Sequence, residues 1–162
     1  MRVPTDLYAT SLALLTDLYQ LTMAYGYWKL GLHEREAVFH LTFRKNPFGG
    51  GYAVAAGLEQ AARFLEALEF TAEDVAYLGT LTGNDDKPLF EQGFLDHLAT
   101  MDWRLDVDGI PEGTAVFPHE PLLRVRGPLL QAQLVETALL TIVNFQTLVA
   151  SKAARVCAAA EG

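Results

Sequence analysis

The stretch PLLQAQLVETALLTIVNFQTLVASKAARVCAAA, residues 128–160, decides how this chain folds. Proline is favourable at a helix start, because the N–H that it lacks would have no partner there. No glycine or proline interrupts the residues that follow. We therefore expect one continuous helix from Pro128 to Ala160. A helix this long and apolar needs packing partners, and because few residues follow it, we expect the chain to be the N-terminal portion of a longer protein.

One side of this expected helix is polar. At about 100° per residue, several polar side chains fall within about 60° of Thr137. They are Thr141, Asn144, Ser151, Lys152 and Arg155. Such a stripe fits a polar site or a water-filled cavity, and it equally fits a face that is turned to solvent. The periodicity alone leaves both interpretations open.

The residues before this helix alternate between helical and extended patterns. We expect helices over residues 11–30, 58–68 and 90–101, a short helix capped by Thr71, a strand over 36–44 and a short strand over 52–56. Thr16 and Asp17 are good N-cap residues for the first helix. Residues 103–107, 114–117 and 122–125 predict three short strands in one small antiparallel sheet, because turn residues separate them.

These elements predict an α+β fold of helices with a small, mostly antiparallel sheet. An N-terminal α/β domain would cover residues 1–127, and the long helix would cover residues 128–162. The hydrophobic fraction of 51% and the charged fraction of 20% are typical of a packed core and exclude a disordered chain.

The charge balance restricts the partners of the protein. Twenty acidic residues against 12 basic ones give a net charge of -8, which disfavours nucleic acid and anionic membrane surfaces. No apolar run is long enough to span a membrane. The single cysteine, Cys157, excludes an internal disulfide, and residues 1–10 lack the pattern of a signal peptide. The sequence thus predicts a cytoplasmic protein.

An acidic protein that binds an anion needs a local basic cluster, and Arg44 and Lys45 form one at the end of an expected strand. The glycines at 49–51 follow directly. Arginine offers a bidentate fork and lysine a point charge, so this segment could receive a phosphate. A solvated strand end with a flexible turn explains the same residues. The spacing is not that of a P-loop.

A second candidate site lies at the start of the first expected helix, at Asp17, Tyr19 and Gln20. Helix N-termini attract anions, and a tyrosine ring suits stacking on a planar ligand. The alternative is purely structural: a capping Asp17, a Tyr19 packed on the core and a Gln20 on the surface. The four histidines are scattered without metal-ligand spacing, so we expect no metal site.

Together these segments resemble nicotinate phosphoribosyltransferases. LLTDLYQLTM (14–23) is similar to the opening signature of that family, and FRKNPFGGG (43–51) to its strand-end loop. GLE (57–59), NFQT (144–147) and ASKAARV (150–156) follow in the family's order. The resemblance spans nearly the whole chain, is weakest over residues 73–104, and covers only the first part of a usual family member.

The resemblance implies an enzyme that forms nicotinate mononucleotide and pyrophosphate from nicotinate and phosphoribosyl pyrophosphate in NAD biosynthesis, with coupled ATP hydrolysis and Mg²⁺. It implies a homodimer with shared active sites and an N-terminal domain of the type II phosphoribosyltransferase fold that leads into an irregular α/β barrel. The segment with the catalytic histidine would lie beyond Gly162. We therefore expect no catalytic residue in this chain, no cofactor bound by it alone, and no turnover.

The resemblance also implies roles for individual residues. Tyr19 would stack on the pyridine ring and Asp17 would help to position it, while Arg44 and Lys45 would bind phosphate oxygens. Asn144, Lys152 and Arg155 are weaker candidates without a fixed role. Two alternatives stay open: a related nicotinamide or quinolinate phosphoribosyltransferase, and a non-catalytic dimerisation or interaction module.

Overall fold

The fold was analysed in a computed structural model that describes residues 11–161, so the expectation about a signal peptide lies outside the described residues. Helices and small antiparallel sheets alternate along the chain, which confirms the predicted α+β class. In order, the elements are α1 (Leu18–Lys29), β1 (Glu36–Leu41), η1 (Pro47–Gly49), β2 (Ala53–Val54), α2 (Leu58–Glu66), α3 (Ala72–Gly79), α4 (Gln92–Ala99), β3 (Asp106–Gly109), β4 (Ala115–Val116), β5 (Leu123–Pro128), α5 (Leu129–Leu134) and α6 (Glu136–Glu161).

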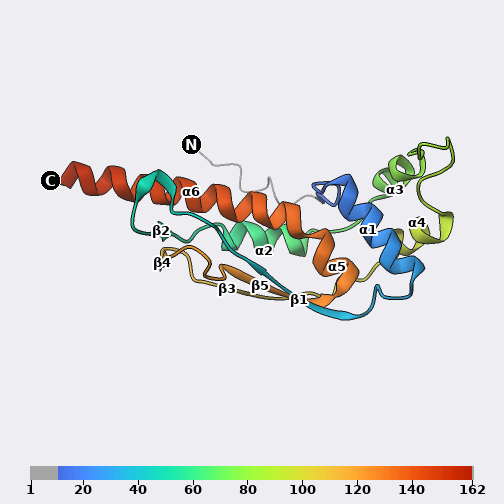
Figure 1. The fold of residues 1–162 in the computed structure, drawn as a ribbon, viewed down its shortest axis with the longest axis horizontal. Coiled ribbons are helices and arrows are strands. Elements are labelled where there is room, and N and C mark those ends of the chain that lie inside the picture. The colour runs from blue at the N-terminus through green and yellow to red at the C-terminus, as the bar shows by residue number, and fades with distance from the viewer. Residues whose placement is uncertain (1–10, 162) are drawn as a thin grey trace.

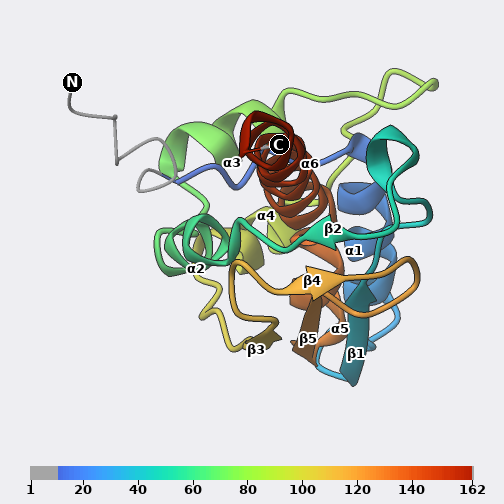
Figure 2. The same cartoon turned by 90° about the vertical axis from the view of Figure 1, so that its left-hand side faces the viewer.

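Helix α6 runs along most of the length of the molecule, and the strands lie beneath it (Figure 1). Helices α1, α3 and α4 gather at the end opposite to the C-terminus. Seen along α6, helix α2 lies on one side of it and both sheets lie below (Figure 2). No helix among the described residues is long and apolar enough to cross a membrane.

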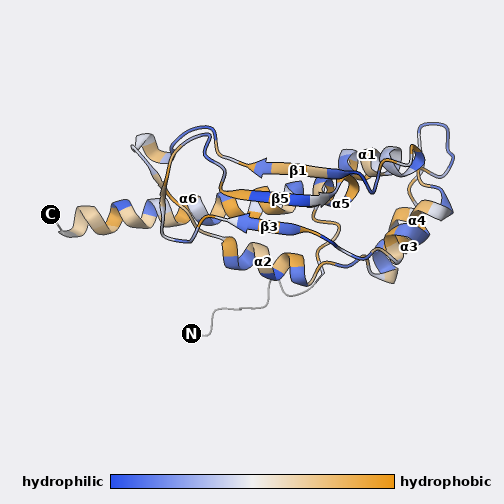
Figure 3. Ribbon diagram, turned by 90° about the horizontal axis from the view of Figure 1, so that it is seen from below, coloured by the Kyte–Doolittle hydropathy of each residue, from blue (hydrophilic) through white to orange (hydrophobic). Residues whose placement is uncertain are grey.

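The predicted single sheet of three late strands is wrong. Strands β3 and β5 pair with β1 in the order β1-β5-β3, while β4 pairs with β2 in a separate two-stranded sheet. The side chains of β5 alternate: Leu123 and Val125 are buried, whereas Arg124 and Arg126 point outward and form ion pairs with Asp108 of β3 and Glu36 of β1. In Figure 3, strands β3 and β5 include hydrophilic residues, which are drawn in blue.

The long helix is not continuous. Val135 separates α5 from α6, and the two helices meet at an angle in Figure 1. Helix α5 packs against α1, β1 and β5, whereas α6 packs against β2 and α2. A straight helix could not bury both surfaces, so the chain turns at Val135, which is itself buried. Pro128 does precede the first helical residue, as predicted.

The first helix is shorter than predicted, because it begins at Leu18 rather than at residue 11. Asp17 takes an extended conformation and is the N-cap, which confirms the capping interpretation for this residue. Thr71 caps α3 as predicted, and its hydroxyl accepts a hydrogen bond from the backbone N–H of Asp74 at 3.1 Å.

Two hydrophobic clusters hold the fold together. One joins the sheets, α2 and the first half of α6 around Phe64, Val125 and Ile142. The other joins α1, α3, α4 and α5 around Leu21, Phe90 and Phe94. Phe94 and its neighbours Leu95 and Leu98 in α4 are all buried, as their spacing predicts.

Candidate functional site

A groove of about 670 Å³ lies between β1 with the residues that follow it and the first part of α6. We call it the β1–α6 groove. Its walls are mainly apolar, and the polar residues that line it are His40, Thr42, Arg44, Glu136 and Asn144. Glu136 and Asn144 are eight residues apart on α6, which corresponds to about 12 Å along the helix. The groove therefore has one acidic and one basic end.

The acidic end is built around Gln20, whose side chain is completely buried. The amide oxygen of Gln20 accepts hydrogen bonds from the hydroxyl groups of Thr16 and Thr137. Its amide nitrogen donates to Glu136 at 3.1 Å. The Thr137 hydroxyl also lies 2.9 Å from a carboxylate oxygen of Asp17. This network fixes the carboxylates of Asp17 and Glu136 relative to each other.

Tyr19 stands beside this network with its side chain 51% exposed. It is therefore not packed on the core, and Gln20 is not on the surface, so the structural alternative for these two residues is wrong. Desolvation raises the pKa of the Tyr19 phenol above its ordinary value, and the negative charges of Glu136 and Asp17 raise it further. The ring is thus free for a ligand and lies close to two fixed carboxylates.

Arg44 and Lys45 follow β1 at the basic end, and both are exposed. Six other cations of the described chain form ion pairs with carboxylates: Lys29, Arg63, Lys87, Arg104, Arg124 and Arg126. Within residues 11–161, Arg44 and Lys45 have no such partner. Only Arg44 lines the groove. Unpaired cations in a protein of net charge -8 are suited to an external anion.

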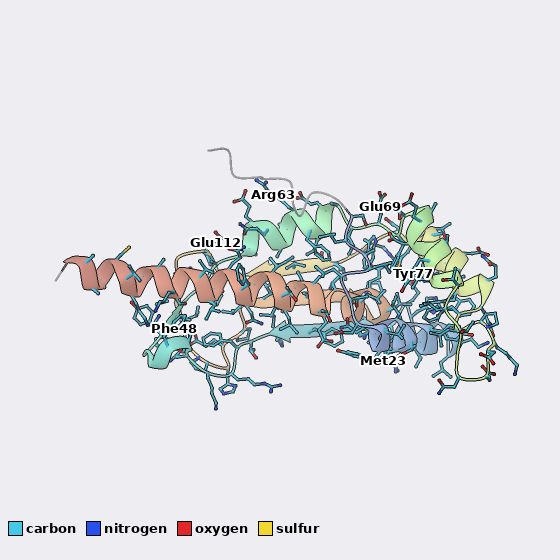
Figure 4. All side chains as sticks on the ribbon, turned by 90° about the horizontal axis from the view of Figure 1, so that it is seen from above. Met23, Phe48, Arg63, Glu69, Tyr77 and Glu112 are labelled. Atoms are coloured by element: carbon cyan, nitrogen blue, oxygen red, sulfur yellow. The ribbon has the colours of Figure 1, made fainter. Side chains whose placement is uncertain are left out.

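The loop after Lys45 is tied to α6 by its aromatic residues. Phe48 has a left-handed backbone conformation with φ 58°. The Lys152 ammonium lies 4.9 Å and the Arg155 guanidinium 5.8 Å from the centre of its ring. Figure 4 shows Phe48 on the loop beside α6, far from Met23 of α1. These cation–π contacts attach the loop to the helix.

Arg155 makes further contacts with the same loop. Its guanidinium donates to the backbone carbonyl of Tyr52 in that loop, at 2.8 Å, and to that of Ser151 one turn earlier in α6, at 2.7 Å. A Cβ atom added at Gly50 would lie only 1.7 Å from Arg155 Nη2, so a side chain there would displace the guanidinium. Arg155 is thus engaged within the chain, whereas the side chain of Lys152 contacts Phe48 and has no hydrogen bond or ion pair within residues 11–161.

The polar stripe of α6 is divided between the interior and the surface. Ser151 is buried and accepts a hydrogen bond from the N–H of Val54 in β2, at 2.8 Å. Thr137 joins the network at α1, whereas Thr141 and Asn144 are exposed. Neither single interpretation of the stripe is therefore correct. The stripe forms hydrogen bonds with other elements at Thr137 and at Ser151, and it faces outward between these two residues.

The sequence analysis did not select Glu136 as a site residue. The spacing of Asp17 and Gln20 is that of a capping box, and the N–H of Asp17 does donate to the Gln20 amide oxygen at 3.3 Å. The capping box explains the position of Gln20 at the start of α1. It contains no information about Glu136, which is brought there by the turn at Val135.

A magnesium ion in an enzyme is usually held by one or two carboxylates together with substrate phosphates and water. Among residues 11–161, no group of three or more His, Cys, Asp or Glu side chains could hold a metal ion.

Comparison with known proteins places this geometry in context. Residues 14–144 match the family model of the nicotinate phosphoribosyltransferase (NAPRTase) N-terminal domain. The chain is 48% identical to the nicotinate phosphoribosyltransferase of Bacillus subtilis over 146 residues, which are 90% of this chain and 29% of that protein. It is 49% identical to nicotinate phosphoribosyltransferase 2 of Arabidopsis thaliana over 88% of this chain and 25% of that protein.

Solved structures agree with the sequence matches. Human nicotinic acid phosphoribosyltransferase superposes with a TM-score of 0.77 and 47% identity over 87% of this chain and 28% of that chain. Nicotinate-nucleotide pyrophosphorylase from Pyrococcus furiosus, at 20% identity and a TM-score of 0.54, shares the fold. The chain thus spans less than a third of the length of the relatives that it matches.

Proposed function

Because this chain belongs to the nicotinate phosphoribosyltransferase family, whose N-terminal domain it carries over residues 14–144, we propose that it supplies substrate-binding residues to that reaction. The reaction joins the ring nitrogen of nicotinate to the anomeric carbon of phosphoribosyl pyrophosphate and releases pyrophosphate. The observation that carries the proposal is an exposed Tyr19 beside Glu136, together with Arg44 in the same groove and Lys45 next to it, neither of which has an ion-pair partner within residues 11–161.

The residue types suit the chemistry. The bond to pyrophosphate breaks as the new C–N bond forms, so catalysis depends on holding the two reactants in line and on stabilising the leaving anion. Tyr19 stacks on the pyridine ring, and Asp17, held by Thr137, limits where that ring can lie. Arg44 and Lys45 bind phosphate oxygens.

The residues of α6 have different parts in this proposal. Asn144 lines the groove near Arg44 and offers an amide to the sugar phosphate. Lys152 adds positive charge beside the loop, and Arg155 keeps the loop in place. The remaining steps belong to segments that the longer relatives carry outside the matched region.

The wider context of the reaction is part of the same proposal and is supported by the family membership. It comprises coupled ATP hydrolysis with Mg²⁺ in the complete enzyme, a homodimer with shared active sites, and a cytoplasmic location in NAD biosynthesis. In this proposal the 162-residue chain alone has no turnover. Formation of nicotinate mononucleotide by the purified chain would overturn that part.

A chimera tests the proposal directly. Residues 14–144 of this chain replace the matching segment of the Bacillus subtilis enzyme, and nicotinate mononucleotide and pyrophosphate are quantified. We expect activity within about tenfold of the parent enzyme, since a tenfold rate difference corresponds to only about 1.4 kcal/mol. A chimera that folds and forms no product would contradict the proposal.

Two alternatives are distinguished by further measurements. Competition among nicotinate, nicotinamide and quinolinate in the chimera separates the related phosphoribosyltransferases, and we expect nicotinate to be preferred. A non-catalytic dimerisation module is favoured by the exposed apolar side chains of α6, which include Phe145 and Val149. Sedimentation of the 162-residue chain tests it, and a monomer at high concentration counts against the module.

A further inference from the structure

Gln20 connects two elements that are far apart in the sequence. Its amide oxygen accepts from the hydroxyl groups of Thr16 and Thr137 and from the N–H of Asp17, which can only donate. Its amide nitrogen faces only acceptors, Glu136 at 3.1 Å and the carbonyl of Gln133 at 3.4 Å. A buried amide with both ends satisfied has a single orientation, because turning it over would oppose like groups. Gln20 therefore fixes the start of α1 relative to the start of α6.

Another buried glutamine provides a comparison. Gln131 is 2% exposed, and its amide bonds to the backbone of Arg104 and Asp102 at 2.7 Å each. Gln131 thus closes a loop by contacts with backbone groups. Three of the partners of Gln20, by contrast, are side chains: Thr16 and Thr137 are half-buried, and the charged Glu136 is exposed. Stability alone does not require a buried amide to orient a surface carboxylate.

The position of that carboxylate matters for the proposed reaction. When the ring nitrogen of nicotinate forms its bond to the anomeric carbon, the nitrogen gains a positive charge and pyrophosphate departs with the bonding electron pair. Fixed negative groups near the ring stabilise that developing charge. They also repel the carboxylate that nicotinate itself carries, so this group must point away from Asp17 and Glu136.

We propose that Gln20 is a positioning residue, which sets the carboxylates of Asp17 and Glu136 beside Tyr19 so that the pyridine ring is oriented and its developing positive charge is stabilised. This inference rests on the proposed function. Glu136 is the residue of α6 through which the effect is exerted. Neither Gln20 nor Glu136 needs to form or break a bond.

The first test uses the 162-residue chain and does not depend on activity. Tyrosine labelled with ¹³C at the ring carbon bearing the oxygen reports the titration of Tyr19. Glu136→Gln removes a negative charge near Tyr19, so we expect the titration midpoint of the Tyr19 phenol to fall. Gln20→Met removes the amide that holds Glu136, and we expect Glu136 to turn to solvent and the same midpoint to fall. Gln131→Met, which is equally buried, should leave it unchanged. A midpoint that moves in Glu136→Gln but not in Gln20→Met overturns the inference.

The second test uses the chimera. The single variant Gln20→Glu places a carboxylate against Glu136. The double variant, which combines Gln20→Glu with Glu136→Gln, restores an amide–carboxylate pair with the two groups exchanged between the positions. We expect the exchange to recover the stability lost in Gln20→Glu, but kcat to stay about tenfold below that of the chimera, because the charge has left the groove. Recovery of both properties would show that Gln20 is purely structural.

The two tests also separate this inference from the proposed function. An inactive parent chimera contradicts the proposed function, and the titration then decides on Gln20 alone. An active chimera whose kcat is unaffected by Gln20→Glu contradicts the positioning role while leaving the proposed function intact. Glu136→Gln changes an exposed side chain, so it keeps the test meaningful if the variants at the buried position 20 do not fold.

Discussion

The two ends of the β1–α6 groove are held by different forces. At the acidic end, hydrogen bonds from Thr137 and the buried Gln20 fix each carboxylate in direction as well as in place. At the basic end, Phe48 and Gly50 hold the loop through cation–π contacts and close packing against Arg155. Hydrogen bonds depend steeply on angle, whereas cation–π contacts tolerate sliding. The acidic end should therefore be rigid and sensitive to substitution, and the basic end should be more tolerant.

The largest effect is expected from Thr137→Val. The change keeps the shape of the side chain but leaves the Gln20 amide oxygen and Asp17 without a shared donor. We expect the free energy of unfolding to fall by about 1–2 kcal/mol, measured by urea denaturation. Thr141→Val, an exposed position on the same helix, is the control. Equal effects at both positions would show that the network is not rigid.

A smaller effect is expected from Gly50→Ala. The new methyl group displaces the Arg155 guanidinium and breaks its hydrogen bond to Tyr52, at a cost of about 1 kcal/mol. Gly51→Ala is the matched control, since nothing lies within 4 Å of a Cβ atom there. In an Arg155→Ala background the cost of Gly50→Ala should disappear. A persistent cost would mean that Arg155 is not its cause.

Phe48→Leu is expected to cost still less, about 0.5–1 kcal/mol, because the loss is confined to exposed cation–π contacts with Lys152 and Arg155. Phe117→Leu provides the comparison, being similarly exposed and without such a contact in the described chain. Thermal unfolding of the two variants distinguishes them. If Phe117→Leu lowers the melting temperature more than Phe48→Leu does, the loop that carries Phe48 is held by apolar contact rather than by Lys152 and Arg155.

Tyr19→Leu and Arg44→Gln should not change stability measurably. Tyr19 is half exposed, and Arg44 has no ion-pair partner within residues 11–161, so neither side chain holds the fold. The melting temperatures of both variants should match that of the unaltered chain. A clear loss at either position would reassign that residue from ligand binding to structure.

Local patterns predicted much of this fold. The apolar spacing of α4 identified Phe94, Leu95 and Leu98 as buried, and the capping residues Asp17 and Thr71 were found from their side chains. Strand pairing was not predictable in the same way. The partners of β5 depend on backbone pairing with β1 and β3 and on the burial of Leu123 and Val125 against residues far away in the sequence, which no local pattern contains.

The site shows the same limit. Tyr19 and Arg44 were candidates from the local sequence, and the resemblance assigned their roles. In the structure Arg44 and Glu136 line one groove, and Tyr19 lies close enough to Glu136 for that charge to raise its pKa. The polar stripe of α6 was visible in the sequence, but its division was not, because the break at Val135 rotates Thr137 and Glu136 toward α1. Tertiary packing of two hydrophobic clusters sets that break, so the contribution of Glu136 appears only in three dimensions.

The most direct test of the substrate-binding proposal is the steady-state kinetics of Tyr19→Leu and Arg44→Gln in the chimera. We predict that Tyr19→Leu raises KM for nicotinate by about tenfold or more, and that Arg44→Gln raises KM for phosphoribosyl pyrophosphate by a similar factor. Each variant should leave the KM of the other substrate nearly unchanged. Values within about twofold of the parent chimera for both variants would contradict the assignment of these residues to substrate binding.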